Sequence, residues 1–385
     1  MGKQYIATAN AGQVHKSDIY GASVTKPYTL TVSGDGYLKL WFNNILENQS
    51  AKDHVKEVFV DKMGLHHVTA FEDVINSVKV TLIAVTTFSG KVVFYQLTTD
   101  NEVEKVTSLK LSSASTASWA IEFVKDPLNQ DHRFVATQSN GNTTVYKFMA
   151  NVDDQKTPAF SLEYFGTVEP KVSNFAMSLA VSPNAALVAT GFANGDIVVS
   201  ELRNCRPVFT FHKPSITSES SGTTVSSAIR ALKFSPSGDI LACGYDSGKF
   251  GNISLYDTKY GEIIGSLTTS THSSSANIDV NAHEGWIFAV DFNEDGDLLL
   301  SAGFDGKIRI WSIDSREKEA TITNSMTDFA ESESENGQDG DLVGILDAKF
   351  IHKGVRAATG SLTNDGIVCV GMDRGVRWFR EAGGI

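Results

Sequence analysis

The stretch between residues 282 and 311 constrains the fold more than any other part of the chain. Residues 288–292 alternate between apolar and polar side chains, residues 298–301 form an apolar run, and residues 308–311 alternate again. A tight, glycine-containing turn separates each run from the next. Short strands joined by tight turns at this spacing predict one blade of a β-propeller, whose repeat is a four-stranded antiparallel sheet.

The turn that begins at Asp305 has counterparts along the whole chain, and an alternating strand follows each of them. In chain order, the seven turns begin at Asp35, Ser89, Asn140, Asn194, Asp246, Asp305 and Asp373. Their spacing exceeds the ~40–45 residues of a typical repeat of this kind, so each blade is expected to carry extra loop. The chain is therefore predicted to be all-β and to form a single seven-bladed propeller.

The two ends of the chain are expected to complete the same blade. Only residues 379–385 follow Trp378, too few for another strand with its turn, whereas residues 4–8 form an orphan strand before the first blade. Pairing these segments would close the ring and remove two exposed strand edges. The expected units are the closing strand of blade 7 at 1–10, blade 1 at 11–62, blade 2 at 63–112, blade 3 at 113–167, blade 4 at 168–212, blade 5 at 213–270, blade 6 at 271–323 and blade 7 at 324–385.

Two blades carry a polar pattern typical of WD40 repeats, in which a histidine bonds an aspartate and a hydroxyl, and the hydroxyl bonds a Trp indole. The residues of this pattern are His15, Thr31, Asp35 and Trp41 in blade 1, and His283, Ser301, Asp305 and Trp311 in blade 6. A Ser-His-Asp hydrolase is the alternative. It is disfavoured because the serine lies inside a strand, the indole uses its hydroxyl, and no nucleophile elbow is present. We therefore expect a buried structural network and no catalytic residue.

The sequence offers little support for metal or cofactor chemistry. Neighbours in a strand face opposite sides, so we expect no shared metal site at His66 and His67, and we expect one of them to open blade 2. No phosphate-binding glycine loop, HExxH motif or EF-hand occurs. Cys205, Cys243 and Cys369 are isolated, which fits neither a disulfide framework nor a zinc site. No metal, cofactor or small-molecule substrate is expected.

The charge and hydropathy of the chain limit the kinds of molecule that we expect it to bind. The net charge of −12 gives no basic field for binding phosphates, so direct nucleic-acid binding is disfavoured. Neither a signal peptide nor an apolar run of membrane-spanning length occurs, so no membrane partner is expected. Extra loop is expected in the Ser/Thr-rich connectors at 215–227 and 270–276, and the acidic segment 327–341 is expected to be disordered or mobile.

A partner-binding surface is predicted at the narrow face of the propeller, around the entrance of the central channel. In a propeller, the residue before each turn and the first residues of each innermost strand surround this entrance. Several of these are large aromatic residues with one arginine among them, a composition typical of interface hot spots. For any single residue, packing into a neighbouring blade is the alternative. The candidate binding residues are Tyr20, Phe88, Trp119, Met177, Arg230, Tyr245, Trp286, Phe288, Phe304 and Met372.

Several segments are specific beyond the general repeat. They are residues 377–384 (Arg-Trp-Phe-Arg-Glu-Ala-Gly-Gly), residues 6–12 (Ile-Ala-Thr-Ala-Asn-Ala-Gly) followed by His15 and Asp18-Ile19, and residues 33–39, 64–68 and 261–267. Through these segments the chain resembles the fungal WD-repeat subunit of the Ski (superkiller) complex, over its full length.

This resemblance implies a non-catalytic scaffold. Members of the family join a TPR-repeat subunit and a DExH-box RNA helicase in the cytoplasm, for 3′-to-5′ mRNA decay by the exosome. Some members also act in the nucleus, where they bind the topoisomerase-VI-like transesterase that makes meiotic DNA breaks. Partners present a short segment, beginning Gln-Arg and ending in an apolar residue, to the narrow face. The alternative function is an adaptor in a nuclear transcription-elongation or chromatin complex.

Overall fold

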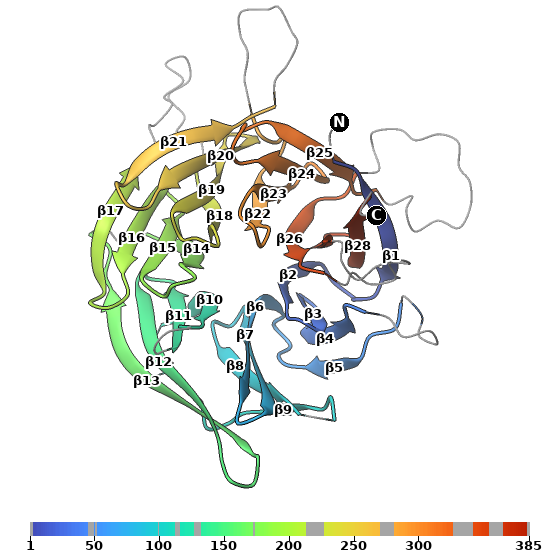
Figure 1. Ribbon diagram of the computed structural model, residues 1–385, viewed down its shortest axis with the longest axis vertical. Coiled ribbons are helices and arrows are strands. Elements are labelled where there is room, and N and C mark those ends of the chain that lie inside the picture. Colours follow the sequence, from blue (N-terminus) through green and yellow to red (C-terminus); the bar gives the residue numbers. More distant parts are fainter. Residues whose placement is uncertain are drawn as a thin grey trace, which may run out of the picture.

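The computed structural model describes residues 3–382 except 45–49, 51, 99, 112–115, 127–131, 172–173, 213–226, 270–280, 326–341 and 354–364. The described residues form seven four-stranded antiparallel sheets, which surround a central channel as the blades of a propeller (Figure 1). Strands are the only regular elements among them, and none of them belongs to a helix long and apolar enough to span a membrane. The prediction of an all-β, seven-bladed propeller is confirmed.

Each of the first six blades takes its strands from the centre outward in chain order. Blade 1 holds β2 (Ile19–Val24), β3 (Tyr28–Ser33), β4 (Tyr37–Phe42) and β5 (Lys56–Phe59). Blade 2 holds β6 (Leu65–Ile75), β7 (Val78–Thr87), β8 (Val92–Leu97) and β9 (Val103–Lys105). Blade 3 holds β10 (Ser118–Val124), β11 (His132–Gln138), β12 (Thr143–Val152) and β13 (Pro158–Val168). Blade 4 holds β14 (Ala176–Val181), β15 (Leu187–Phe192), β16 (Asp196–Glu201) and β17 (Arg206–His212).

The remaining blades follow the same scheme until the chain returns to its start. Blade 5 holds β18 (Ile229–Phe234), β19 (Ile240–Ser247), β20 (Phe250–Asp257) and β21 (Glu262–Leu267). Blade 6 holds β22 (Ile287–Phe292), β23 (Leu298–Gly303), β24 (Lys307–Ser312) and β25 (Lys318–Thr323). Blade 7 holds β26 (Ile345–Ile351), β27 (Gly366–Gly371), β28 (Gly375–Glu381) and, as its outermost strand, β1 (Tyr5–Gln13).

The closing pair of strands joins the two ends of the chain. β1 runs antiparallel to β28, with Tyr5 opposite Glu381 and Ala7 opposite Phe379. Beyond the last pair, the backbone N–H of Ala382 donates to the carbonyl of Gln4 at 2.7 Å. β1 continues to Gln13, so the closing strand is longer than the expected segment 1–10. The first strand therefore supplies the outer edge of the last blade.

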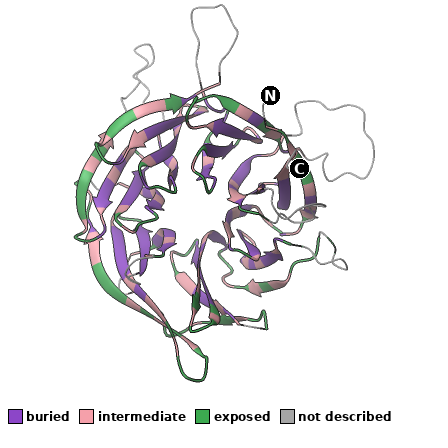
Figure 2. Cartoon of the chain, viewed as in Figure 1, coloured by how far each residue is buried: buried purple, intermediate pink, exposed green. Residues whose placement is uncertain are grey.

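The hydrophobic core lies between neighbouring blades. The middle strands are buried on both faces, as in β3 and β23, whereas outer strands such as β13 expose alternate residues (Figure 2). One apolar cluster joins β3 and β4 of blade 1 to β6, β7 and β8 of blade 2. Each blade thus buries its faces against its neighbours, as repeat proteins do. The largest wholly buried side chains are Trp41, Trp311 and Trp378.

Candidate functional site

Each innermost strand contains a β-bulge just after its first residue. In β2, Ile19 pairs with Ser33 and Gly21 pairs with Val32, so Tyr20 has no partner across the ladder. The other six innermost strands show an equivalent shift of register. A bulge bends its strand and turns the extra side chain in a new direction. The bulges thereby place one ring of side chains around the channel entrance: Tyr20, His66, Trp119, Met177, Arg230, Phe288 and Leu346.

A second set of positions surrounds the first at the turns. In six blades, the backbone N–H of the residue after the second strand of the sheet donates to the carbonyl that precedes the innermost strand, and in blade 5 the N–H of Asp246, within β19, does so. These donors are Gly34, Phe88, Ser139, Ala193, Asp246, Phe304 and Met372, at 2.8 to 3.1 Å. The same bond in all blades holds these residues at equivalent depths. We call the bulge residues and these turn residues, together with Trp286, the narrow-face ring.

The prediction that Tyr245 belongs to this ring is wrong. Tyr245 pairs with Ile229 inside the sheet, and its ring packs against the core of blades 4 and 5. The register is shifted because the β19–β20 hairpin continues to the pair Ser247 and Phe250. The left-handed glycine of this turn, Gly248 at φ 64°, comes two residues after Asp246 rather than one. Asp246 therefore takes the ring position.

Aromatic side chains from blades 1 to 3 form one half of the ring. Tyr20 meets the ring of Phe88 edge-on at 5.1 Å, and Phe88 lies 6.2 Å from Trp119. His66 stacks on Trp119 at 4.2 Å between ring centroids, and the ring of Phe175, which precedes β14, meets Trp119 edge-on at 5.1 Å. Phe175 and the ring role of His66 escaped the sequence prediction. His66 occupies the bulge position of its innermost strand, and Phe175 is the last residue before its innermost strand. A comparison of these two positions across the blades could have revealed both residues.

The two adjacent histidines do not face opposite sides, because His66 is the bulge residue of β6. Their Nδ1 atoms lie 2.5 Å apart, and His66 Nε2 donates to the carbonyl of Thr87 at 3.1 Å. Burial, followed by the charge of His67, lowers the pKa of His66 to about 2, and burial and Lys349 lower the pKa of His67 to about 4. Both are neutral at pH 7. No group of three or more His, Cys, Asp or Glu residues within the described ranges could hold a metal ion.

Neither histidine opens blade 2, contrary to the prediction. The opening histidines His15 and His283 stand four residues before their innermost strands. Asp61 occupies that position in blade 2, where β6 begins at Leu65. The spacing to the innermost strand, not the presence of a histidine, defines this position.

Blades 5 and 6 form the other half of the ring around a fixed guanidinium. Arg230 lies over the rings of Trp286 at 4.5 Å and Phe288 at 5.5 Å, and its Nε donates to the buried carboxylate of Asp246 at 2.9 Å. Trp286 Nε1 donates to the carbonyl of Gly248 at 2.8 Å. The Trp286 ring is still 38% exposed, and Phe304 is 52% exposed. This half of the ring presents apolar surface beside the Arg230 guanidinium, whose position is fixed by these contacts.

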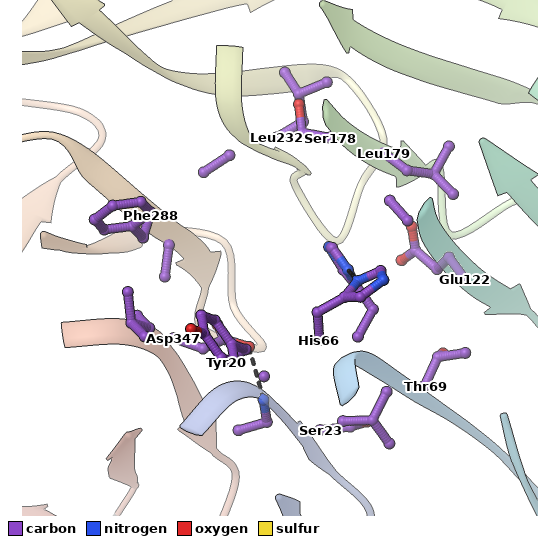
Figure 3. Close-up of a pocket in the computed structure, with 18 of the residues that line it drawn as sticks. Tyr20, Ser23, His66, Thr69, Glu122, Ser178, Leu179, Leu232, Phe288 and Asp347 are labelled. Atoms are coloured by element: carbon purple, nitrogen blue, oxygen red, sulfur yellow. Dashed lines mark hydrogen bonds between the residues drawn. The ribbon is translucent and has the colours of Figure 1, made fainter. Parts of the chain in front are cut away.

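The other nine predicted binding residues lie in this ring. None of them is buried, and Phe88, Trp286 and Phe304 are exposed. Figure 3 shows Tyr20, His66 and Phe288 directed toward the channel. The nine residues are Tyr20, Phe88, Trp119, Met177, Arg230, Trp286, Phe288, Phe304 and Met372.

Deeper in the channel, charged side chains form hydrogen bonds between neighbouring blades. Carboxylates of Glu122, Asp291 and Asp347 each accept a backbone N–H from the next blade, at 2.9 Å, and Figure 3 shows Glu122 and Asp347 among the residues that line the channel. Lys233 Nζ lies 3.9 Å from Glu122 and 3.7 Å from Asp291. Burial raises the pKa of the Glu122 carboxyl, with the Lys233 charge opposing this rise. These hydrogen bonds cross the blade boundaries and fix the relative positions of the blades that carry the narrow-face ring.

The predicted polar pattern forms in both blades. His283 Nε2 and Trp311 Nε1 each lie 2.8 Å from Ser301 Oγ, and His283 Nδ1 lies 2.9 Å from Asp305. Arg309, which the sequence reading missed, donates to Asp305 at 2.7 Å. Burial raises the pKa of Asp305, but the hydrogen bond from His283 and nearby positive charges outweigh it, and the pKa is well below its usual range.

Blade 1 repeats this geometry with threonine in place of serine. His15 lies 3.0 Å from Asp35 and 3.1 Å from Thr31 Oγ1, and Trp41 Nε1 donates to the same hydroxyl at 3.0 Å. Burial raises the pKa of the Asp35 carboxyl, but the bond from His15 outweighs it and lowers the pKa to about 2. Since Thr31 and Ser301 have no exposed surface, neither hydroxyl is accessible as a nucleophile.

The acidic segment 327–341, the connector 270–276 and residues 215–226 lie outside the described residues.

Comparison with known proteins agrees with this architecture. Residues 275–312 match the family described as WD domain, G-beta repeat, and residues 177–287 match the WD40 domain of anaphase-promoting complex subunit 4. A segment of 88 residues is 29% identical to the SAGA complex/transcription factor TFIID complex subunit Taf5 of Schizosaccharomyces pombe, covering 23% of this chain and 13% of Taf5.

One relative matches from end to end. The antiviral protein SKI8 of Saccharomyces cerevisiae is 39% identical over 402 residues, which cover 100% of both chains. A match of this extent goes well beyond the shared repeat, because it spans the whole chain. The chain belongs to the SKI8 family, the WD-repeat family of the Ski complex that its sequence resembles.

Proposed function

We propose that this protein is a non-catalytic scaffold subunit of the Ski complex and joins the TPR-repeat subunit to the DExH-box RNA helicase. The narrow-face ring is the observation that carries the proposal. It presents the exposed Trp286 and Phe304 together with Arg230, whose guanidinium is already oriented. Aromatic residues and arginine held on a rigid support are what protein interfaces use as anchors.

The ring suits a short extended segment of a partner better than a small substrate. Its side chains come from separate blades and surround an entrance, so a peptide can contact several of them at once. The hydroxyls that could act as nucleophiles are buried in the structural networks. With a net charge of −12, the protein itself is poorly suited to bind RNA, and the helicase would supply that contact.

Further partners and locations follow from the same family relationship. The proposal extends to the topoisomerase-VI-like meiotic transesterase as a second partner, which would use the same ring in the nucleus, in addition to a cytoplasmic role in mRNA decay. An adaptor in a nuclear transcription-elongation or chromatin complex is the competing function. The match to Taf5 covers only 23% of the chain, so it gives this alternative less support than SKI8 gives the first.

Affinity purification separates these functions. We expect the tagged protein to retain the helicase and the TPR subunit, and we expect the double variant Trp119→Ala/Phe304→Ala to lose both. Truncation of a central anchor commonly costs 2 kcal/mol or more, which is about a thirtyfold loss of affinity. Tyr164→Ala, a change of an exposed ring on the outer strand β13, is the matched control. Recovery of elongation factors instead of the helicase would favour the adaptor.

A further inference from the structure

A pocket at the outer rim of blade 4 lies beside the narrow-face ring. Its floor and walls are largely apolar and include the buried Phe192 and the side chain of Val198, with Pro170 and Pro207 on either side. Its volume is about 210 Å³, which exceeds the ~30 Å³ that one water molecule takes up in the liquid several times over. We call it the rim pocket.

The rim pocket continues from the aromatic half of the ring. Phe175, whose ring contacts Trp119 at 5.1 Å, directly follows Asn174, which lines the pocket. The side-chain oxygen of Asn174 accepts the backbone N–H of Phe175 at 2.7 Å. An extended chain that leaves Trp119 over blade 4 therefore reaches the pocket without crossing another blade.

Three of the polar residues that line the pocket, His212, Asp196 and Asn194, are partnered with one another. His212 Nδ1 lies 2.8 Å from one carboxylate oxygen of Asp196, and the Asn194 amide donates to the other at 2.7 Å. Within this trio no charge requires a counterion from a ligand, and the exposed Lys171 is the other charged residue of the lining. An apolar side chain would cover the apolar floor and remove it from water, which is favourable.

We propose that the rim pocket receives an apolar side chain from the same partner segment that binds the narrow-face ring. This inference rests on the proposed function and adds a second anchoring point to it. The ring fixes where the segment lies over the channel, and the rim pocket fixes the direction in which it leaves, across blade 4. Two anchors of this kind select for the spacing between two side chains of the partner.

Filling the pocket tests the inference. Thr210 lies on the exposed edge strand β17, opposite Val198, and lines the pocket, so Thr210→Trp would occupy it. Thr321 holds the equivalent exposed place in blade 6, opposite Arg309, which makes Thr321→Trp the matched control. Val198→Ser is a second variant, because it removes apolar lining without adding bulk. Thermal melts confirm that each variant is folded.

The probe is a set of overlapping peptides that covers the sequence of the TPR subunit, measured by fluorescence anisotropy. We expect the tightest peptide to lose about tenfold in affinity for Thr210→Trp and about threefold for Val198→Ser. The affinity for Thr321→Trp should stay within about twofold of wild type. Alanine substitution of one apolar peptide residue should weaken binding to wild type but add no further loss to Thr210→Trp.

The outcomes separate this inference from the proposed function. If the peptide binds wild type, requires Trp119 and binds Thr210→Trp and Val198→Ser as tightly as wild type, the rim pocket is not a subsite and the ring assignment stands. If no peptide binds wild type, or if binding is indifferent to Trp119→Ala, the proposed function itself fails, and the inference with it.

Discussion

The Ser301 hydroxyl shows how single residues in this protein are held. It has no exposed surface, and it meets the His283 and Trp311 ring nitrogens at the same 2.8 Å distance. A hydroxyl with such partners contributes to stability and is not available for chemistry. Asp305 completes the set because it also takes the Arg309 guanidinium. The network is therefore a stability element whose value can be measured.

Replacement of His283 by alanine should destabilise the fold. His283→Ala leaves Ser301 and Asp305 with fewer partners, and a lost buried network partner costs about 1–3 kcal/mol of unfolding free energy. Urea denaturation measures this loss. Glu284→Ala, at the exposed neighbour, is the control and should stay within about 0.5 kcal/mol. A His283→Ala variant as stable as wild type would mean that the network contributes nothing.

His66 and His67 should make the protein sensitive to acid. Their pKa values, about 2 and about 4 in the folded chain, lie below the ~6.5 of an ordinary histidine. As the pH falls below about 6.5, these two histidines become protonated in the unfolded chain but stay neutral in the folded chain. The free energy of unfolding therefore falls. One such histidine costs up to about 2 kcal/mol at pH 5.

Thermal melts between pH 7 and pH 5 check this expectation. His66→Phe keeps an aromatic ring against Trp119 and removes one titrating group, so its melting temperature should fall less over this range. Val208→Ala, a change at an exposed position of β17 that carries no titrating group, should keep the wild-type dependence. An identical dependence in wild type and His66→Phe would contradict the assignment.

At the scale of the strands, each innermost strand departs from regular alternation at its β-bulge. The bulge residues form part of the narrow-face ring. The sequence predicted the strands and the turns because their periodicity and punctuation are local, and it predicted the closing pair because the last blade lacked a strand while an orphan strand preceded the first blade. It placed Tyr245 wrongly and missed His66 and Phe175, because bulges and the longer β19–β20 hairpin change which way a side chain points. Register depends on pairing with another strand, which a linear pattern does not contain.

Removal of the first strand should open the ring. Deletion of residues 1–9 takes away most of β1 and exposes the edge of β28 from Trp378 to Glu381. Unpaired edges of this kind promote aggregation. We expect a large drop in melting temperature, together with aggregation visible by light scattering. Deletion of residues 1–4, which precede the strand, is the control. An unchanged melting temperature in the longer deletion would refute the closing role of β1.

At the scale of the whole molecule, stability comes from seven similar interfaces between blades and not from one central core. Apolar clusters join blade 1 to blade 2, blade 6 to blade 7, and blade 7 to blade 1. From inside the channel, Asp291 and Asp347 reinforce the boundaries of blade 7 with blades 6 and 1, and Glu122 reinforces the boundary between blades 3 and 4. A narrow-face surface that draws on every blade is therefore only as rigid as the weakest of these boundaries.

The acidic segment 327–341 should be dispensable for this assembly. Its sequence carries repeated Glu and Asp and one large apolar residue, Phe329, so it has little to bury, and loop length costs little entropy. A short Gly/Ser linker in its place should leave the melting temperature and binding of the TPR-subunit peptide unchanged. A variant that folds but no longer binds would move part of the interface into this segment.

The pairing of β1 with β28 also has a consequence for the order of folding. The first strand to leave the ribosome finds its partner only when the last strand has been made, so six blades can assemble while the seventh waits. Contacts between such distant parts of a chain form slowly. Because the backbones of Gln4 and Ala382 already meet, a short linker could join the ends, and new ends could open at the exposed turn near Asn204. In such a permuted chain blade 7 would fold from neighbouring strands, and the late pairing of the first strand with the last would move to β17 and β16 of blade 4.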